Sequence, residues 1–190
     1  QGWEQRLGAR IVNYADDFVI LCRTRAEEAG EGMRRIMQTL KLSVNEEKTK
    51  ICHVPEESFD FLGYTIGRCW SSHRARAYLG TRPSPKRVKR MCEEISAMTG
   101  KSRLEQEATP LVCGLNRKLR GGANYFSLGP VSKAYRAVDS HARYRLRQWL
   151  RQKRKTKGAG TGKYPDEYLY GTLGLLRLES TTRNLPWAKA

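Results

Sequence analysis

Two short apolar runs flank a pair of adjacent aspartates near the start of the chain. The runs, residues 10–13 and 18–22, are rich in β-branched and aromatic side chains, which is typical of buried strands. The four residues between them, 14–17, read Tyr-Ala-Asp-Asp. The pattern therefore predicts a β-hairpin that carries Asp16 and Asp17 at its tip.

The pattern changes after the hairpin. A Thr-x-x-Glu capping box at residues 24–27 precedes apolar residues at helical spacing, which predicts a helix that reaches Leu40. Residues 51–54 and 59–67 have the composition of two strands, the second bent at Gly63. This order of elements indicates an α/β layer whose sheet bears the two aspartates.

Beyond Gly67 the apolar spacing becomes helical. Ser84, followed by a proline, predicts the start of a helix that Gly100 ends. A Thr-Pro pair at residues 109–110 predicts a second helix, which runs towards the glycine pair at 121–122. The C-terminal part of the chain is therefore expected to be helical.

Pro130 opens a third helix, which has two contrasting faces. One face is apolar and comprises Val131, Ala134, Tyr135, Val138, Ala142, Leu146, Trp149 and Leu150. The opposite face carries Arg136, Arg143, Arg147, Arg151 and Arg154. Asp139 is the only acidic residue in this helix, so we expect the arginines to lack acidic partners. Such a ladder repels itself and is best explained by bound phosphates; a solvated surface is the alternative.

The formal net charge of +17 is unevenly distributed. Residues 1–67 carry a net charge of −2 and residues 68–190 carry +19, which indicates a polyanionic partner. Besides the arginines of the third helix, we assign to this partner Lys86, Arg87, Lys89, Arg90, Lys153, Lys155 and Lys157. Nucleic acid fits better than a membrane, because no apolar run approaches the roughly 20 residues needed to span a bilayer.

The cysteines offer no metal-binding or disulfide pattern. Cys22, Cys52, Cys69, Cys92 and Cys113 are 17 to 30 positions apart and never form a Cys-x-x-Cys pair. We therefore predict five reduced thiols that fill the core, and no zinc site.

Asp16 and Asp17 have two possible explanations. Adjacent carboxylates repel each other unless a cation lies between them, and oxygen-rich sites suit Mg²⁺. Two such ions commonly clamp the reacting oxygens during displacement at phosphorus. The alternative is a turn that uses Asp because Asp tolerates turn geometry. The strongly cationic remainder of the chain favours metal binding.

The order of these motifs resembles the C-terminal part of bacterial group II intron reverse transcriptase/maturases. Residues 14–17 look like the catalytic palm motif, residues 42–51 like the block that follows it, and residues 61–64 like the primer grip. Three further segments look like the thumb, or maturase X domain, of the family: 84–86, 119–126 and 147–150. The family usually has Trp where Gly122 stands.

The resemblance implies an α+β fold in two parts. Residues 1–68 would form the C-terminal half of a polymerase palm, and residues 69–190 an all-α, basic thumb/maturase domain. It also implies RNA-directed DNA synthesis, together with binding of intron RNA to assist splicing, in the bacterial cytoplasm. The implied partners are group II intron RNA, an RNA template with its DNA primer, dNTP and a DNA target.

The same resemblance implies roles for named residues. Asp16 would be the principal ligand and Asp17 the weaker ligand of a two-Mg²⁺ site. The primer end would be held by Phe61, Leu62, Gly63 and Tyr64. Lys48 would lie near the incoming dNTP; an ordinary surface lysine is the alternative.

One part of the family pattern is missing. A polymerase palm takes a further carboxylate from an earlier strand, and Glu4 is the only acidic residue before Tyr14. We therefore expect a C-terminal fragment that is inactive by itself. DNA cleavage is not expected, because no Cys/His-rich endonuclease region follows. The alternative function is a non-catalytic, maturase-like RNA-binding module with a vestigial Asp pair.

Overall fold

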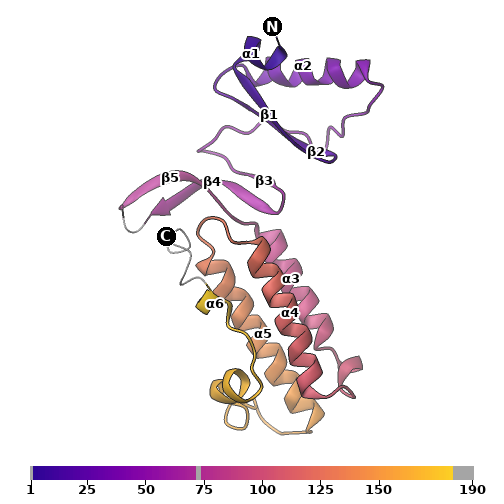
Figure 1. Cartoon of the computed structure of the whole chain (residues 1–190), viewed down its shortest axis with the longest axis vertical. Helices are drawn as coiled ribbons and strands as arrows, with labels where there is room; N and C mark the ends of the chain where they lie inside the picture. The colour runs from indigo at the N-terminus through magenta and orange to yellow at the C-terminus, as the bar shows by residue number, and fades with distance from the viewer. Residues whose placement is uncertain (1, 72–73, 182–190) are drawn as a thin grey trace.

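The computed structural model describes residues 2–71 and 74–181. Three parts follow one another along its long axis (Figure 1): a β1–β2 hairpin with two helices, a sheet of β3, β4 and β5, and a helical bundle. The predicted α+β class is confirmed, with the described strands between Ala9 and Pro83 and the helical bundle after them.

The hairpin that carries the aspartates is present. Strand β1 (Ala9–Tyr14) pairs antiparallel with β2 (Asp17–Cys22), while α1 (Trp3–Leu7) precedes it and α2 (Ala26–Thr39) follows. The expectation of buried strands is wrong for this hairpin, since almost all of β1 is exposed. A two-stranded sheet beside α1 and α2 lacks the layers that would cover its apolar side chains.

Two local predictions near α2 are also wrong. The capping box does not form, because the N-cap residue Arg25 has a left-handed φ of 62° and no side chain caps the helix. Residues 51–54 form no strand; Ile51 and Val54 remain 43% and 38% exposed. No described strand lies beside this segment to supply the ladder hydrogen bonds that a strand needs.

The predicted bent strand is a second hairpin. Strand β3 (Phe59–Phe61) turns at Leu62 and Gly63 into β4 (Tyr64–Ser71). Both turn residues have a positive φ, 50° and 78°, as a two-residue type I′ turn requires. The bend expected at Gly63 is therefore a complete reversal of the chain.

Strand β4 continues into a third strand where a helical pattern was expected. It pairs with β5 (Arg76–Pro83) from Tyr64 opposite Pro83 to Ser71 opposite Arg76. The boundary expected between residues 68 and 69 falls inside β4, so one sheet spans both of the expected parts.

The predicted helices build the bundle. They are α3 (Pro85–Met98), α4 (Ala108–Tyr125) and α5 (Ser132–Lys153), with a short 3₁₀ turn at Lys101–Arg103. Ser84 caps α3 as predicted, because its Oγ accepts a hydrogen bond from the Arg87 backbone N–H at 3.3 Å. Helix α4 runs through the glycine pair that was expected near its end.

The C-terminal segment folds back onto α5. A π-helical turn, Tyr168–Thr172, and α6 (Leu178–Thr181) place Leu169, Leu175 and Leu178 in the core of the bundle. Asp139 receives hydrogen bonds from the backbone N–H groups of Leu178 (2.9 Å) and Glu179 (3.0 Å). Burial raises the pKa of this carboxyl, although the two hydrogen bonds oppose the shift. The thumb/maturase domain expected over residues 69–190 also includes residues 182–190, which lie outside the described residues.

The structure tests the expectation that the cysteines fill the core, and it also shows whether any described helix could cross a membrane. All five cysteines are free thiols, but only Cys69 is buried and Cys113 is exposed, so the expectation of core filling is wrong for Cys113. No helix in the described part of the chain has the length and apolarity needed to cross a bilayer.

Candidate active site and nucleic-acid interface

Asp16 and Asp17 lie next to each other at the tip of the β1–β2 hairpin. Both are exposed, and the left-handed φ of 51° at Ala15 permits the tight turn that presents them. Their carboxylate oxygens suit Mg²⁺ chemically. Within the described residues, however, no cluster of three or more His, Cys, Asp or Glu side chains could hold a metal ion. Two carboxylates alone are fewer ligands than a two-metal site requires.

Lys48 lies on the exposed turn that follows α2. Its backbone N–H donates to the carbonyl oxygen of Asn45 (3.1 Å) and to the Asn45 side-chain Oδ1 (3.2 Å). Asn45 also accepts from the Thr49 N–H and hydroxyl. These contacts shape the turn of the 42–51 motif and leave the Lys48 side chain exposed.

The turn predicted to hold the primer is bonded to the helical bundle at three points. The Tyr64 hydroxyl donates to the carbonyl oxygen of Tyr125 (2.6 Å), and the Tyr125 hydroxyl donates to that of Leu62 (2.9 Å). The carbonyl oxygen of Gly63 accepts from the backbone N–H of Ser84 (2.9 Å). Residues 62–64 are thus positioned by the start of α3 and the end of α4.

Aromatic rings cover the same junction. Tyr64 lies with its ring centroid 6.3 Å from that of Tyr125 and 5.4 Å from that of Phe126. Burial raises the pKa of the Tyr64 hydroxyl. The Arg87 guanidinium lies 6.0 Å from the centre of the Tyr125 ring. A Cβ at Gly63 would lie 2.9 Å from Arg87 Nε, so this turn position requires glycine for both its φ and its space.

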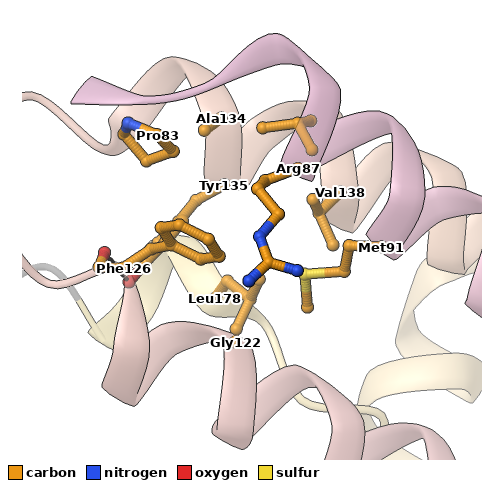
Figure 2. A pocket seen from close by; sticks show the side chains of 10 residues that line it. Pro83, Arg87, Met91, Gly122, Phe126, Ala134, Tyr135, Val138 and Leu178 are labelled. Atoms are coloured by element: carbon orange, nitrogen blue, oxygen red, sulfur yellow. Dashed lines mark hydrogen bonds between the residues drawn. The ribbon is translucent and has the colours of Figure 1, made fainter. Parts of the chain in front are cut away.

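A small pocket lies beside this junction, between α3, α4 and α5. Figure 2 shows the Arg87 side chain crossing it beside Met91. The Met91 side chain fills the space next to Gly122, since a Cβ there would lie 2.9 Å from its sulfur. Tyr135 closes the pocket and donates its hydroxyl to the carbonyl oxygens of Ala123 (3.0 Å) and Phe126 (2.8 Å). The pocket is a gap in the packing, because its lining is apolar apart from Arg87 and Tyr135.

The expectation that the arginines of α5 lack acidic partners is wrong. Arg143 and Arg147 both bind Asp166, at 2.7 Å and 2.5 Å. Arg147 also donates to the carbonyl oxygen of Tyr164 (2.9 Å), and Arg151 donates to that of Gly158 (2.8 Å). The C-terminal segment brings Asp166 back onto the helix, a contact that no local pattern on α5 indicates.

These ion pairs shift the pKa of Asp166. Burial acts to raise it, but the hydrogen bonds from Arg143 and Arg147 outweigh burial and lower the pKa of this carboxyl below its usual value. Both arginines thus stabilise the fold, so a role in RNA binding would come in addition.

Lys153 also has a structural position. Its Nζ donates to the carbonyl oxygens of Leu104 (3.1 Å) and Gln106 (2.9 Å) and lies 3.4 Å from the Glu107 carboxylate. It also lies 5.5 Å from the centre of the Trp149 ring. These contacts join the end of α5 to the segment that precedes α4.

The other basic residues predicted to bind RNA lie at the surface, apart from the half-buried Arg87. On α3, Lys89 and Arg90 are exposed and lie 3.9 Å and 3.3 Å from Glu93 and Glu94, which are weak pairs one helical turn away. Exposed positions also belong to Lys86, Arg136, Arg154, Lys155 and Lys157. These side chains remain available to phosphates, and their role in RNA binding stays a prediction.

Two positioning residues were missed from the sequence. Tyr125, whose hydroxyl is bonded to the Leu62 carbonyl oxygen, could have been suspected because an Asn-Tyr-Phe run follows the glycine pair. Asp166 could have been suspected because it is the first acidic residue after Asp139. Neither signal identifies the partner, because each contact spans many residues of the chain.

Two family comparisons cover most of the chain. Residues 1–66 match the family described as reverse transcriptase (RNA-dependent DNA polymerase), which spans the Asp-Asp hairpin and the 61–64 turn. Residues 88–166 match the group II intron, maturase-specific domain, which spans the bundle. No curated protein matches the chain. These families imply nucleic-acid substrates, intron RNA among them, and reverse transcriptases generally use Mg²⁺. The chain, with a reverse transcriptase segment followed by a maturase domain, belongs to the group II intron-encoded reverse transcriptase/maturases.

Proposed function

We propose that this chain supplies two palm carboxylates and the RNA-binding domain of an enzyme that copies RNA into DNA. One observation carries the proposal. A single polypeptide joins an exposed Asp-Asp hairpin tip to a basic maturase bundle, through a turn that Tyr64 bonds to the bundle. An RNA bound on the bundle would therefore lie on the same molecule as the carboxylates.

Asp16 and Asp17 would hold Mg²⁺, with Asp16 as the principal ligand. When bound, Mg²⁺ activates the primer 3′-hydroxyl and neutralises the charge on the leaving pyrophosphate. A further carboxylate from outside the described residues would complete the ligand set. Residues 61–64 would orient the primer end, and Lys48 would lie near the incoming dNTP.

The surface basic residues would bind intron RNA during splicing. The same surface would hold the RNA template with its primer, and a DNA target after splicing. The net charge of +19 on residues 68–190 favours binding of phosphates, and this binding should weaken as the salt concentration rises. This activity would take place in the bacterial cytoplasm, where the intron is transcribed.

Primer extension in an assembled enzyme tests the catalytic assignment. Residues 1–190 are joined to the fingers and upstream palm of a group II intron reverse transcriptase, and cDNA synthesis on an RNA template is measured with Mg²⁺. Asp16→Asn should abolish synthesis and leave intron RNA affinity unchanged, because the hairpin tip lies apart from the bundle (Figure 1). Glu31→Gln, at an exposed position of α2, is the charge-matched control and should retain activity. Wild-type extension by Asp16→Asn would remove Asp16 from the metal site.

A second candidate function is a non-catalytic RNA-binding module with a vestigial Asp pair. The observation in its favour is that the described residues contain no third metal ligand near the pair. An assembled protein that binds intron RNA and promotes splicing, but makes no cDNA with Asp16 and Asp17 intact, would support this alternative.

A further inference from the structure

We propose that the exposed face of the β4–β5 hairpin binds a single-stranded segment of nucleic acid by stacking a base on Trp70. The site lies outside the Asp-Asp hairpin and outside the basic helices. This inference depends on one part of the proposed function, namely that the protein binds nucleic acid.

The strand register places apolar and cationic side chains on one face. Arg68 lies opposite Leu79, and Trp70 lies opposite Ala77. Because side chains alternate along a strand, these four residues share a face of the hairpin. Trp70 is 58% exposed and Leu79 is 55% exposed, and Arg68 is also exposed. A large, exposed aromatic ring therefore lies on the same face as the cross-strand pair of Arg68 and Leu79, two positions further along β4.

The charge around this face suits phosphate. Residues 61–92 contain eight Lys or Arg and no Asp or Glu, so nothing acidic on the hairpin would repel a polyanion. Arg74 and Arg76 are exposed near the hairpin end. Arg82 supports the other strand, since its guanidinium donates to the carbonyl oxygen of Arg68 (3.2 Å). A partner with an anionic backbone and flat rings matches this combination.

The exposed ring favours a single strand over a duplex. Bases in a duplex are stacked on one another, whereas an unpaired base offers a free face to an aromatic side chain. The position along the chain agrees with this choice, because β4 begins at Tyr64 in the primer-grip turn and leads directly to Trp70. In Figure 1 the β4–β5 hairpin extends to one side above the bundle.

Fluorescence anisotropy tests the site with the full 190-residue chain and a labelled oligo(U) of about 12 nucleotides. Trp70→Ala should weaken binding about tenfold, and Trp70→Phe, which keeps a ring, should weaken it less. Arg68→Gln should weaken binding and flatten the salt dependence of log K by about 0.7.

Two controls match these variants. Tyr144 on α5 is 59% exposed, so Tyr144→Ala removes an aromatic ring of similar exposure away from the hairpin. Arg117 is exposed on α4, so Arg117→Gln removes the same charge elsewhere. Tyr144→Ala should leave oligo(U) affinity within twofold of wild type, and Arg117→Gln should cost less affinity than Arg68→Gln.

Binding of a blunt-ended, fully paired RNA duplex separates the two proposals. All Trp70 variants should bind it as wild type does, because stacking on Trp70 needs an unpaired base. If folded Trp70→Ala binds oligo(U) with wild-type affinity, the stacking site is overturned while RNA binding by the bundle stands. If the wild-type chain binds neither RNA, the proposed function itself fails. A change of sedimentation in Trp70→Ala without a change of oligo(U) affinity would make this face a contact between copies, which also overturns the site.

Discussion

The Tyr64 hydroxyl donates to the carbonyl oxygen of Tyr125 at 2.6 Å, and the two rings lie stacked with their planes 26° apart. Tyr64 begins β4 and Tyr125 ends α4, so the pair joins the Leu62–Gly63 turn to the maturase bundle. A displacement of the end of α4 would therefore move the turn. In the proposed enzyme, RNA bound to the bundle and the position of the primer end would be mechanically linked.

Tyr125→Phe should weaken this junction without unfolding the protein. The substitution removes the hydrogen bond to the Leu62 carbonyl and keeps the ring contacts. We expect a loss of about 1 kcal/mol in the free energy of unfolding, or a fall of about 2–4 °C in the thermal midpoint. Calorimetry measures both, with Tyr144→Phe as an exposed control. An unchanged midpoint would mean that this bond adds no stability.

Substitution of Arg147 should lower the stability of the fold, whereas substitution of Arg136 should weaken RNA binding. Arg147 is 14% exposed and bonded to Asp166 and Tyr164, so Arg147→Gln should cost about 2 kcal/mol of stability. Arg136 is exposed, so Arg136→Gln should change stability by less than about 0.5 kcal/mol. For intron RNA, Arg136→Gln should flatten the salt slope by about 0.7–0.9. Urea unfolding measures the stability of both variants, and RNA titrations at several salt concentrations measure their binding. Equal losses of stability in the two variants would contradict a structural role that is specific to Arg147.

Asp166 should make stability depend on acidic pH. Its pKa is lower in the folded protein than in the unfolded chain, so its stabilising effect is present above the unfolded pKa, about 3.9, and is lost as pH falls through the folded pKa. Asp166→Asn should lose this part of the pH dependence and be less stable at pH 7. Unfolding by urea at several pH values from about 6 to 2 measures both effects. Parallel curves for the two proteins would show that the ion pairs contribute nothing.

Tyr135 should produce the opposite dependence at alkaline pH. Burial raises the pKa of its hydroxyl to about 12 from the ordinary value of 10.0. The neutral form is the one favoured by folding, so its contribution is complete below pH 10.0 and is lost as pH rises through about 12. Tyr135→Phe should therefore lose less stability than wild type between these pH values. Tyr78 and Tyr170, whose pKa values burial also raises, are present in both proteins, so the difference between the two pH profiles, measured by urea unfolding, reports Tyr135 and its interaction with Tyr64.

Gly122 should tolerate a methyl group but not an indole. A Cβ there meets only the flexible end of Met91, and alanine favours a helix by about 1 kcal/mol over glycine, so Gly122→Ala should be neutral or stabilising. Gly122→Trp should destabilise the bundle, because Met91 and the neighbouring pocket residues occupy the space. Adding Met91→Ala should recover part of that loss, as thermal unfolding would show. A Gly122→Trp variant as stable as wild type would mean that the pocket opens freely.

Local signals in the sequence predicted the elements that depend on neighbouring residues. The Tyr-Ala-Asp-Asp turn, the Ser84 cap and the proline before α5 each act within a few positions, and each element begins where its signal indicated. The β4–β5 hairpin was missed because its strands run through glycines and arginines with little apolar alternation. The Leu62–Gly63 turn reverses the chain and brings β3 alongside one edge of β4, and β5 pairs with the other edge.

Burial and charge pairing depended on distant residues and could not be predicted locally. Ile11 and Val12 have strand propensity, but their exposure depends on how many strands and helices cover them. Arg143 and Arg147 were expected to be unpaired because Asp166 lies beyond the end of their helix. The carboxylate pair was placed correctly at a hairpin tip, whereas its metal-binding role remains a prediction.

The hydrogen bonds that Asp139 receives determine when α5 can pack into the core of the bundle during synthesis. Its carboxylate is buried near the middle of α5, and both of its backbone donors come from residues 178 and 179. Until those residues leave the ribosome, packing α5 into the core would bury a charge with no donor opposite it. The maturase bundle can therefore reach its final packing only after residues 178 and 179, which lie 39 and 40 positions beyond Asp139, have been synthesised.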